Sequence, residues 1–159
     1  MRWFRRERET QPAESAPVDD SPAVLRQNLD ELIRFVNRSS GRLPGEAVVT
    51  ARRVTDVLRA VIDSSEVREL DIYTVVSVRG VVDDYLPTTL KSFLALDPAH
   101  HDVARARGQT PVEALQEQLE LMWESTSAVL VAAQAQDVDA LMTQGSFMRT
   151  KFSRSDLDL

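Results

Sequence analysis

The chain has 159 residues and a formal net charge of -6, and its 43% hydrophobic content is enough to bury one sizeable core. The negative charge argues against nonspecific binding to nucleic acid, for which a basic face is needed to neutralise phosphates. The absence of cysteine excludes disulfides and thiolate zinc sites, and no run approaches the ~20 apolar residues that a membrane-spanning helix needs.

Residues 1–20 are expected to form a flexible tail, because a stretch rich in Pro, Glu, Ser and Ala has too little apolar surface to offset its ordering entropy. The opening MRWFRR lacks the apolar stretch of a signal peptide, so a cytoplasmic location is predicted. The same opening supports a weak peripheral membrane contact, in which arginines approach anionic headgroups and aromatic rings enter the interface. The residues of this contact are Arg2, Trp3, Phe4, Arg5 and Arg6.

The first two predicted helices each carry one apolar stripe. Ser21 can cap the first helix through its hydroxyl, and Pro22 fits its first position because that amide has no intrahelical partner. This helix is expected to end before Ser39, and the second to begin after Pro44. Apolar residues recur at spacings of three and four, which places them on one face of each helix. They are Leu25, Leu29, Leu32 and Val36 in the first helix, and Ala47, Ala51, Val54, Leu58 and either Val61 or Ile62 in the second.

The segment DIYTVVSVRGVVDDYL, residues 71–86, combines strand-forming residues with an apolar helical stripe. Clustered Ile and Val favour a strand, and Gly80 weakens either element. We predict a helix, because a lone strand would leave its backbone edge unpaired. Its inward residues are expected to be Ile72, Val75 or Val76, Val82 and Leu86.

Pro87 is expected to end this helix and to start another, because proline lacks an amide donor and disfavours the α conformation for Leu86. The run DDYLPTTLKSFLAL, residues 83–96, is therefore predicted to form a corner. A short helix from Thr88 to Leu96 follows, with inward residues Leu90, Phe93 and Leu94.

The last third of the chain predicts a connection and two further helices. Residues 99–109 are expected to form an exposed connection with one helical turn. Thr110 and Glu113 form a capping-box pattern, in which the two side chains satisfy backbone amides at a helix start. A bend near Asp137 is expected to separate this helix from a last one at residues 138–152. The inward residues are Leu115, Leu119, Met122, Thr126, Val129, Leu130 and Ala133 in the first of these helices, and Leu141, Met142, Phe147 or Met148, and Phe152 in the second.

These elements together predict an all-α fold. Helices joined by short connections pack as antiparallel neighbours and bury their apolar stripes against one another. The predicted domain is a single antiparallel helical bundle over residues 21–153, with a proline-broken central helix. A flexible N-terminal tail at residues 1–20 precedes it, and a frayed C-terminus at residues 154–159 follows it.

Two polar clusters are the candidates for chemistry. His100, His101 and Asp102 could bind a metal together, but a closed site needs about four ligands and two exposed loop histidines explain the cluster more simply. Asp83 and Asp84 could serve acid/base or magnesium chemistry, but neighbours on a helix point about 100° apart, and two polar turn residues explain the pair. The sequence therefore predicts no catalytic residue, no metal site and no cofactor.

The run DYLPTTL, residues 84–90, continued by Phe93 and Leu94, resembles the YLPTT-type motif of the XpaC-like family, labelled 5-bromo-4-chloroindolyl phosphate hydrolysis proteins. A less specific likeness extends from about Ala51 to Phe152. The resemblance implies an α-helical cytoplasmic protein, in a family associated with toxic-anion (tellurite) resistance proteins of the TelA type. Some relatives carry membrane-inserted segments where this chain has a short polar tail.

The motif itself is interpreted as a fold-specifying corner, because a proline and a capping threonine account for its residue types. Its tyrosine and leucine can anchor the corner, and one threonine can cap the next helical turn. The residues assigned to this corner, in a structural role or as a partner contact, are Tyr85, Leu86, Pro87, Thr88, Thr89 and Phe93.

The leading functional hypothesis is a noncatalytic cytoplasmic helical adaptor that binds a protein partner in toxic-anion or envelope stress. The resemblance makes a TelA-like toxic-anion resistance protein the candidate partner. The alternative is a hydrolase of phosphate esters, as the family label suggests, with the two polar clusters as its site. A third hypothesis is peripheral attachment at the inner face of the membrane through residues 2–6.

Overall fold

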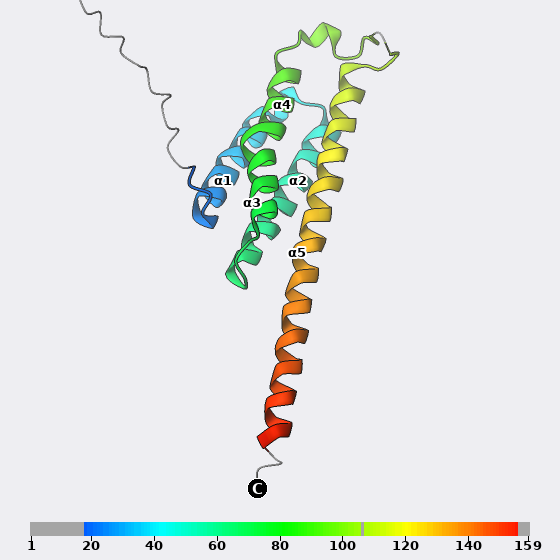
Figure 1. The fold of residues 1–159 in the computed structure, drawn as a ribbon. Helices are drawn as coiled ribbons and strands as arrows, with labels where there is room; N and C mark the ends of the chain where they lie inside the picture. Colours follow the sequence, from blue (N-terminus) through cyan, green and yellow to red (C-terminus); the bar gives the residue numbers. More distant parts are fainter. Residues whose placement is uncertain (1–17, 106, 156–159) are drawn as a thin grey trace, which may run out of the picture.

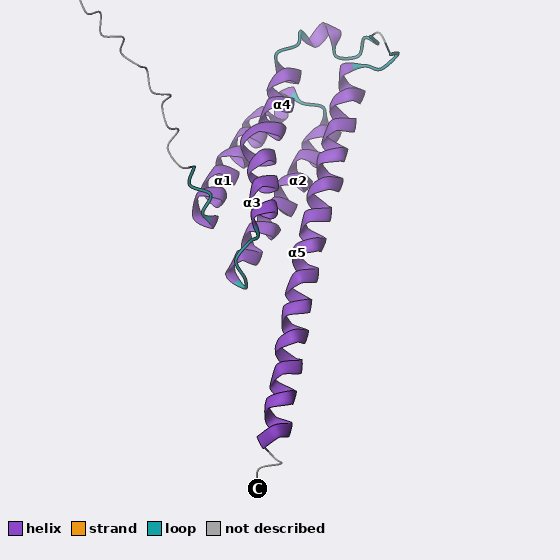
Figure 2. Ribbon diagram, in the orientation of Figure 1, coloured by secondary structure: helices purple, strands orange, loops and turns teal. Residues whose placement is uncertain are grey.

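The computed structural model describes residues 18–105 and 107–155, and the regular structure in these residues is helical, without strands (Figure 2). α1, α2, the collinear run from α3 to α4, and α5 alternate in direction, and α5 extends well beyond the others (Figure 1). The predicted all-α bundle is therefore confirmed. The elements are α1 (Pro22–Ser39), α2 (Gly45–Asp63), α3 (Ile72–Arg79), the π-helical segment η3 (Gly80–Tyr85), α4 (Leu86–Leu94) and α5 (Pro111–Ser155), with short 3-10 turns η1 (Ser40–Arg42), η2 (Ser64–Glu66) and η4 (Pro98–His100).

The start of α1 matches its sequence signals. The hydroxyl of Ser21 accepts a hydrogen bond from the backbone amide of Val24 at 3.4 Å, and Pro22 occupies the first helical position. Of the predicted tail, residues 1–17, including the arginines and aromatic residues of the predicted membrane contact, lie outside the described residues. Residue 20 is already tied to the bundle, because the Asp20 carboxylate lies 2.7 Å from Nη1 of Arg79.

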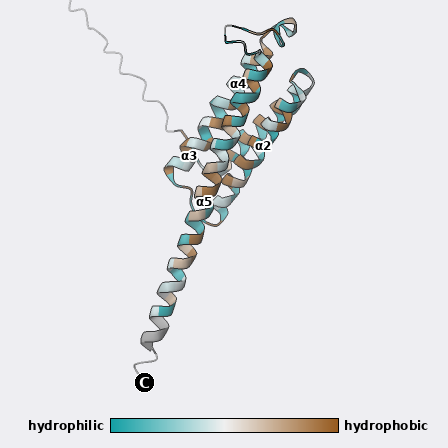
Figure 3. Ribbon diagram, turned by 90° about the vertical axis from the view of Figure 1, so that its right-hand side faces the viewer, coloured by the Kyte–Doolittle hydropathy of each residue, from teal (hydrophilic) through white to brown (hydrophobic). Residues whose placement is uncertain are grey.

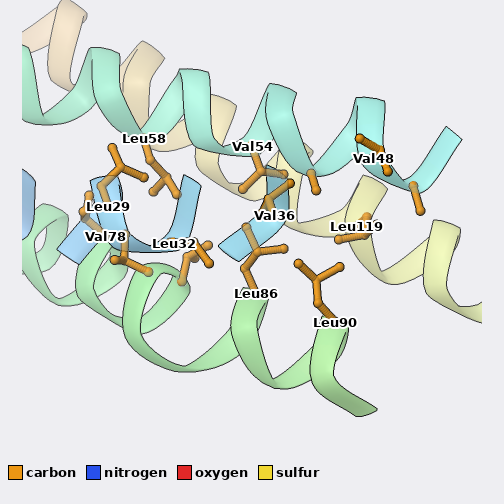
Figure 4. Close-up of a cluster of buried hydrophobic side chains, with 14 of the residues drawn as sticks. Leu29, Leu32, Val36, Val48, Val54, Leu58, Val78, Leu86, Leu90 and Leu119 are labelled. Atoms are coloured by element: carbon orange, nitrogen blue, oxygen red, sulfur yellow. The ribbon is translucent and has the colours of Figure 1, made fainter. Parts of the chain in front are cut away.

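The core lies where the inner faces of the helices meet, and Figure 4 shows side chains from several helices pointing into it. Figure 3 shows apolar segments concentrated where the helices face one another. Both predicted stripes of α1 and α2 are buried, and Val61 and Ile62 are both inside rather than one of them. Burial of a Leu, Ile or Val side chain contributes about 1.5–3 kcal/mol, so these two stripes supply much of the stability of the bundle.

The central helix is interrupted before Pro87, but by a π-helical segment instead of the predicted corner. Leu86 keeps helical dihedral angles, φ -68° and ψ -49°, and its backbone amide donates to the carbonyl of Val81, five residues earlier. Because this turn holds one more residue than an α-helical turn, the backbone can absorb the proline without changing the direction of the chain. The expectation that Leu86 would leave the α conformation was wrong.

The π segment also changes which residues of α3 face inward. Ile72, predicted to be inward, is 65% exposed, and Val75 is half-buried. The buried row is spaced by four residues throughout: Thr74, Val78, Val82, Leu86 and Leu90. Such a row drifts by about 40° per step around a regular α-helix, and the wider π turn compensates for part of this drift.

The C-terminal third forms one continuous helix, α5, so the predicted bend near Asp137 was wrong. The capping box at its start is confirmed, since Thr110 N donates to the Glu113 carboxylate at 2.8 Å and Glu113 N donates to the Thr110 hydroxyl at 3.2 Å. Around residue 137 the helix contains no proline or glycine and is rich in alanine, the best helix former. Asp137 instead accepts a hydrogen bond from Nε of Arg68 at 2.9 Å, which ties the middle of α5 to the bundle.

Beyond this point α5 leaves the bundle (Figure 1). Leu141, Met142 and Met148, which were predicted to face inward, are exposed. The physical reason is that no other helix reaches this part of α5, so its apolar side chains have nothing in the bundle to pack against. Phe147 and Phe152 lie outside the described side chains.

Asp71 caps the start of α3 and gives the bundle a pH-dependent contribution. Its carboxylate accepts hydrogen bonds from the amide of Thr74 at 2.9 Å and from the Thr74 hydroxyl at 3.0 Å. The hydrogen bond from the Thr74 amide lowers the pKa of the Asp71 carboxyl below its ordinary value. A lowered folded-state pKa means that this contribution is complete above the unfolded-state pKa and is lost as the pH falls through the folded-state value.

We therefore expect Asp71→Ala to reduce the free energy of unfolding by about 1 kcal/mol at neutral pH. The difference from wild type should shrink as the pH falls below about 4, where the carboxylate of the unfolded chain is protonated. Urea unfolding curves of both proteins at neutral and acidic pH measure this. A difference that stays constant over the pH range would contradict the capping role of the carboxylate.

Candidate functional site

An apolar groove of about 650 Å³ lies between two walls, one formed by α3 with the π segment and the other by α5. The fully buried side chain of Val61, from α2, contributes to its lining. The walls, which can be followed in Figure 1, bring together residues far apart in the sequence, such as Val78 and Val129. Both walls are needed to form the groove. One wall supplies lining residues between Val76 and Tyr85, and the other supplies lining residues between Gln118 and Val129 on α5.

Both walls of the groove carry apolar side chains that are exposed to solvent. Val76 is 48% exposed, and Tyr85 and Leu121 are each 58% exposed. Ile72 and Tyr73, at the start of α3, are exposed as well. A cluster of exposed apolar residues around a hollow is typical of a binding surface, whereas single exposed apolar residues have no such meaning.

The π segment places Tyr85 at the groove. A Cβ atom added at Gly80 would lie 3.1 Å from Cε2 of Tyr85, so the aromatic ring rests directly over the glycine. Glycine permits this close approach because it has no side chain. The first residue of the YLPTT motif therefore contributes to the groove, while the residue after it, Leu86, points into the core.

Two polar side chains of the groove, those of Arg79 and Thr126, are engaged within the protein. Nη1 of Arg79 donates to both carboxylate oxygens of Asp20, at 2.9 Å and 2.7 Å. The hydroxyl of Thr126 donates to the backbone carbonyl of Met122 in its own helix. Among the lining residues only Arg79 and Tyr85 are titratable. The groove is thus suited to binding an apolar surface and lacks the paired acid and base that hydrolysis uses.

The structure places the carboxylate pair outside the groove. Asp83 accepts a hydrogen bond from Nδ2 of Asn28 at 3.1 Å, and Asp84 accepts one from the hydroxyl of Thr88 at 3.1 Å. The hydroxyl of Thr89 lies 3.4 Å from Oε1 of Gln118 on α5. Neither threonine caps α4, whose start has no side-chain capping bond, so the predicted capping role was wrong. The physical reason is that the helix runs on through the π segment and leaves no free end to cap.

The histidine cluster is also dispersed. His100 and Asp102 are exposed, whereas the ring of His101 packs against Phe93 with centroids 4.3 Å apart. Nε2 of His101 is buried and has no hydrogen-bond partner among the described residues. No group of three or more His, Cys, Asp or Glu side chains in the described part of the chain is placed to hold a metal ion.

The other motif residues are divided between core and surface. Leu86, Leu90 and Phe93 are buried in the core, Pro87 is half-buried, and Thr88 is exposed. The sequence reasoning missed Val76 and Leu121 as site residues. One signal was available: α3 carries more apolar residues than one stripe can bury, which indicates a second apolar contact.

No helix in the described residues is both long enough and apolar enough to cross a bilayer. The chain matches no family model, no curated protein and no solved structure. The likeness to the XpaC-like family therefore depends on the motif residues themselves.

Proposed function

We propose that the chain is a noncatalytic helical adaptor that binds an amphipathic helix of a protein partner in the groove between α3 and α5. The observation that carries this proposal is the set of exposed apolar side chains at the groove, among them Val76, Tyr85 and Leu121. The α5 wall from Gln118 to Val129 is about 16 Å long at ~1.5 Å per residue. This length accommodates two to three turns of a partner helix, which would insert apolar residues at positions i, i+3 or i+4, and i+7.

The YLPTT-type motif supports a proposal for the identity of the partner. Because the motif resembles that of the XpaC-like family, we propose a TelA-like toxic-anion resistance protein as the partner, in a cytoplasmic response to toxic-anion or envelope stress. The position of Tyr85 at the groove gives the motif a role in this binding beyond the packing of Leu86 and Phe93. Weak peripheral membrane contact through residues 2–6 would add to this function and is separate from the groove.

The test compares partners recovered from native lysate by four purified forms of the protein. These are the full chain, a chain lacking residues 1–17, Val76→Glu in the groove, and Val49→Glu as the matched control. Val49 is 57% exposed on α2 and does not line the groove, so the same change of side chain is made at a similar exposure. We expect one stoichiometric partner with the full chain, the tail deletion and the control, and its loss with Val76→Glu, because a buried unpaired carboxylate is costly.

Other results would assign the function elsewhere. Retention of the partner by Val76→Glu would contradict the groove as its binding site, and loss of the partner with the tail would place binding in residues 1–17. Metal-dependent turnover of a phosphate monoester by the same material, abolished by changing His100, His101, Asp83 or Asp84, would support the hydrolase instead.

A further inference from the structure

The face of α5 that points away from the bundle carries a second apolar row. Its members are all exposed and alternate between spacings of three and four residues: Ala128, Val131, Ala135, Val138 and Met142. The row is offset by two residues, about 200°, from the buried Thr126 and Ala133, so it cannot pack on the bundle. A three-four spacing sustained over several turns is the pattern of a coiled-coil seam. We call this row the outer seam.

The charges along α5 are unevenly distributed. Its first half carries Glu113, Glu117, Glu120 and Glu124, and no Lys or Arg occurs between Pro111 and Met148. The first basic residue is the exposed Arg149, and the sequence places two more at positions 151 and 154. The helix therefore has an acidic end beside the bundle and a basic end beyond it.

We propose that a second copy of this chain docks on the outer seam, with the two α5 helices antiparallel. An antiparallel pair places the acidic end of each helix beside the basic end of the other, whereas a parallel pair would place the four glutamates of one copy beside those of the other. The two bundles lie on opposite sides of the pair, because each packs on the face of α5 opposite its outer seam. The outer seams of the two copies then cover each other, and the protruding half of each α5 lies beside the first half of the other.

One register satisfies both the sizes and the charges of the facing residues. It places Val131 opposite Ala135 of the second copy and Val138 opposite Ala128 of the second copy, so each of these layers joins a branched side chain to a small one, while Met142 lies opposite Glu124 at the edge of the seam. The same register places the exposed Leu121 opposite Gly145 and Glu117 opposite Arg149 of the second copy. Leu121 belongs to both surfaces, whereas Val131 and Val138 of the outer seam do not line the groove, so variants of these two valines test the dimer separately from the adaptor function.

Sedimentation velocity over a concentration series tests the dimer with the full chain. We expect a dimer for wild type and for the control Val49→Glu, and a monomer for Val131→Glu combined with Val138→Glu. The two seam valines are exposed in the single chain, so their replacement leaves the bundle folded, which circular dichroism checks. A wild-type chain that is monomeric throughout, or a dimer that both glutamates leave intact, would overturn the proposal.

A charge exchange tests the register with variants that leave the seam intact. Glu117→Lys or Arg149→Glu alone should weaken the dimer roughly tenfold, because each creates two repulsive contacts in a symmetric pair. The double variant should restore it. Glu117 and Arg149 are about 48 Å apart along one helix, so they can meet only between copies. Failure of the double variant to recover would contradict this register.

The orientation is tested by cysteine substitution, since the chain has no cysteine of its own. A mixture of Ala128→Cys and Val138→Cys proteins should form a mixed disulfide. Each variant alone should not, because its two cysteines would lie about 15 Å apart, beyond the ~7 Å that a disulfide permits between Cα atoms. Rapid disulfide formation by Met142→Cys alone would instead show a parallel pair and would overturn the antiparallel arrangement.

Discussion

Replacement of Leu86 by alanine is expected to lower the free energy of unfolding by about 2–5 kcal/mol. Leu86 is fully buried, and in Figure 4 it points with Leu90 toward Val54 and Val36, on α2 and α1. Removing its side chain leaves a cavity among three helices that cannot close without moving their backbones. Because a domain of this kind is stabilised by only roughly 5–15 kcal/mol, this single change removes a large share of the total.

Urea unfolding of Leu86→Ala beside Val49→Ala measures this effect. The control removes a side chain of similar chemistry from an exposed position and is expected to change the free energy of unfolding by no more than about 0.5 kcal/mol. Equal, small losses in both variants would mean that Leu86 is not a core residue.

Deletion of Asp56, an exposed residue in the middle of α2, is expected to unfold the bundle. Every residue after the deletion rotates by about 100° relative to those before it. Leu58, Val61 and Ile62 would leave the core, at a cost of about 5–9 kcal/mol for three apolar side chains. Circular dichroism of the purified variant should show a loss of helical signal, because this cost is comparable to the entire stability of the domain.

The matched deletion removes Asp84, an exposed residue of the π segment, together with Pro87→Ala. In this variant the hydrogen bond from Leu86 to Val81 becomes an ordinary α-helical bond, because one residue fewer separates the two. We expect wild-type helical content and a cooperative unfolding transition. If both deletions unfold the protein equally, the π segment does not act as a one-residue insertion in a continuous helix.

The stripes of α1 and α2 were predictable because helix burial in this bundle follows a regular spacing. Leu25, Leu29, Leu32 and Val36 share one face of any α-helix, and their burial requires only a neighbouring apolar surface. The start of α5 was predictable for a similar reason, since its capping box is local and depends on Thr110 and Glu113 alone.

The central helix was harder to predict because a local rule gave the wrong answer. Proline disfavours the α conformation in the residue before it, yet Leu86 is helical because the π segment absorbs the strain. The signal for this arrangement was the four-residue spacing from Thr74 to Leu90, which a regular helix cannot keep on one face. Reading that spacing as a π segment would also have placed Ile72 outside the core.

The groove could not be predicted from local pattern, since its walls are distant in the sequence. Val76 and Leu121 become neighbours of one hollow only when α3 packs beside α5. The exposed half of α5 was missed for a related reason: its apolar residues have helical spacing, and spacing alone does not tell whether another helix is long enough to cover them.

Site-specific photocrosslinking tests the adaptor proposal most directly. A photoreactive phenylalanine derivative is placed at position 76 in the groove and, in a second protein, at position 49 on α2, and each is irradiated in native lysate. We expect one dominant adduct of defined mass from position 76 that is absent from position 49, because only the groove holds the partner helix. No adduct at position 76, or the same adducts from both positions, would contradict the groove as the binding site.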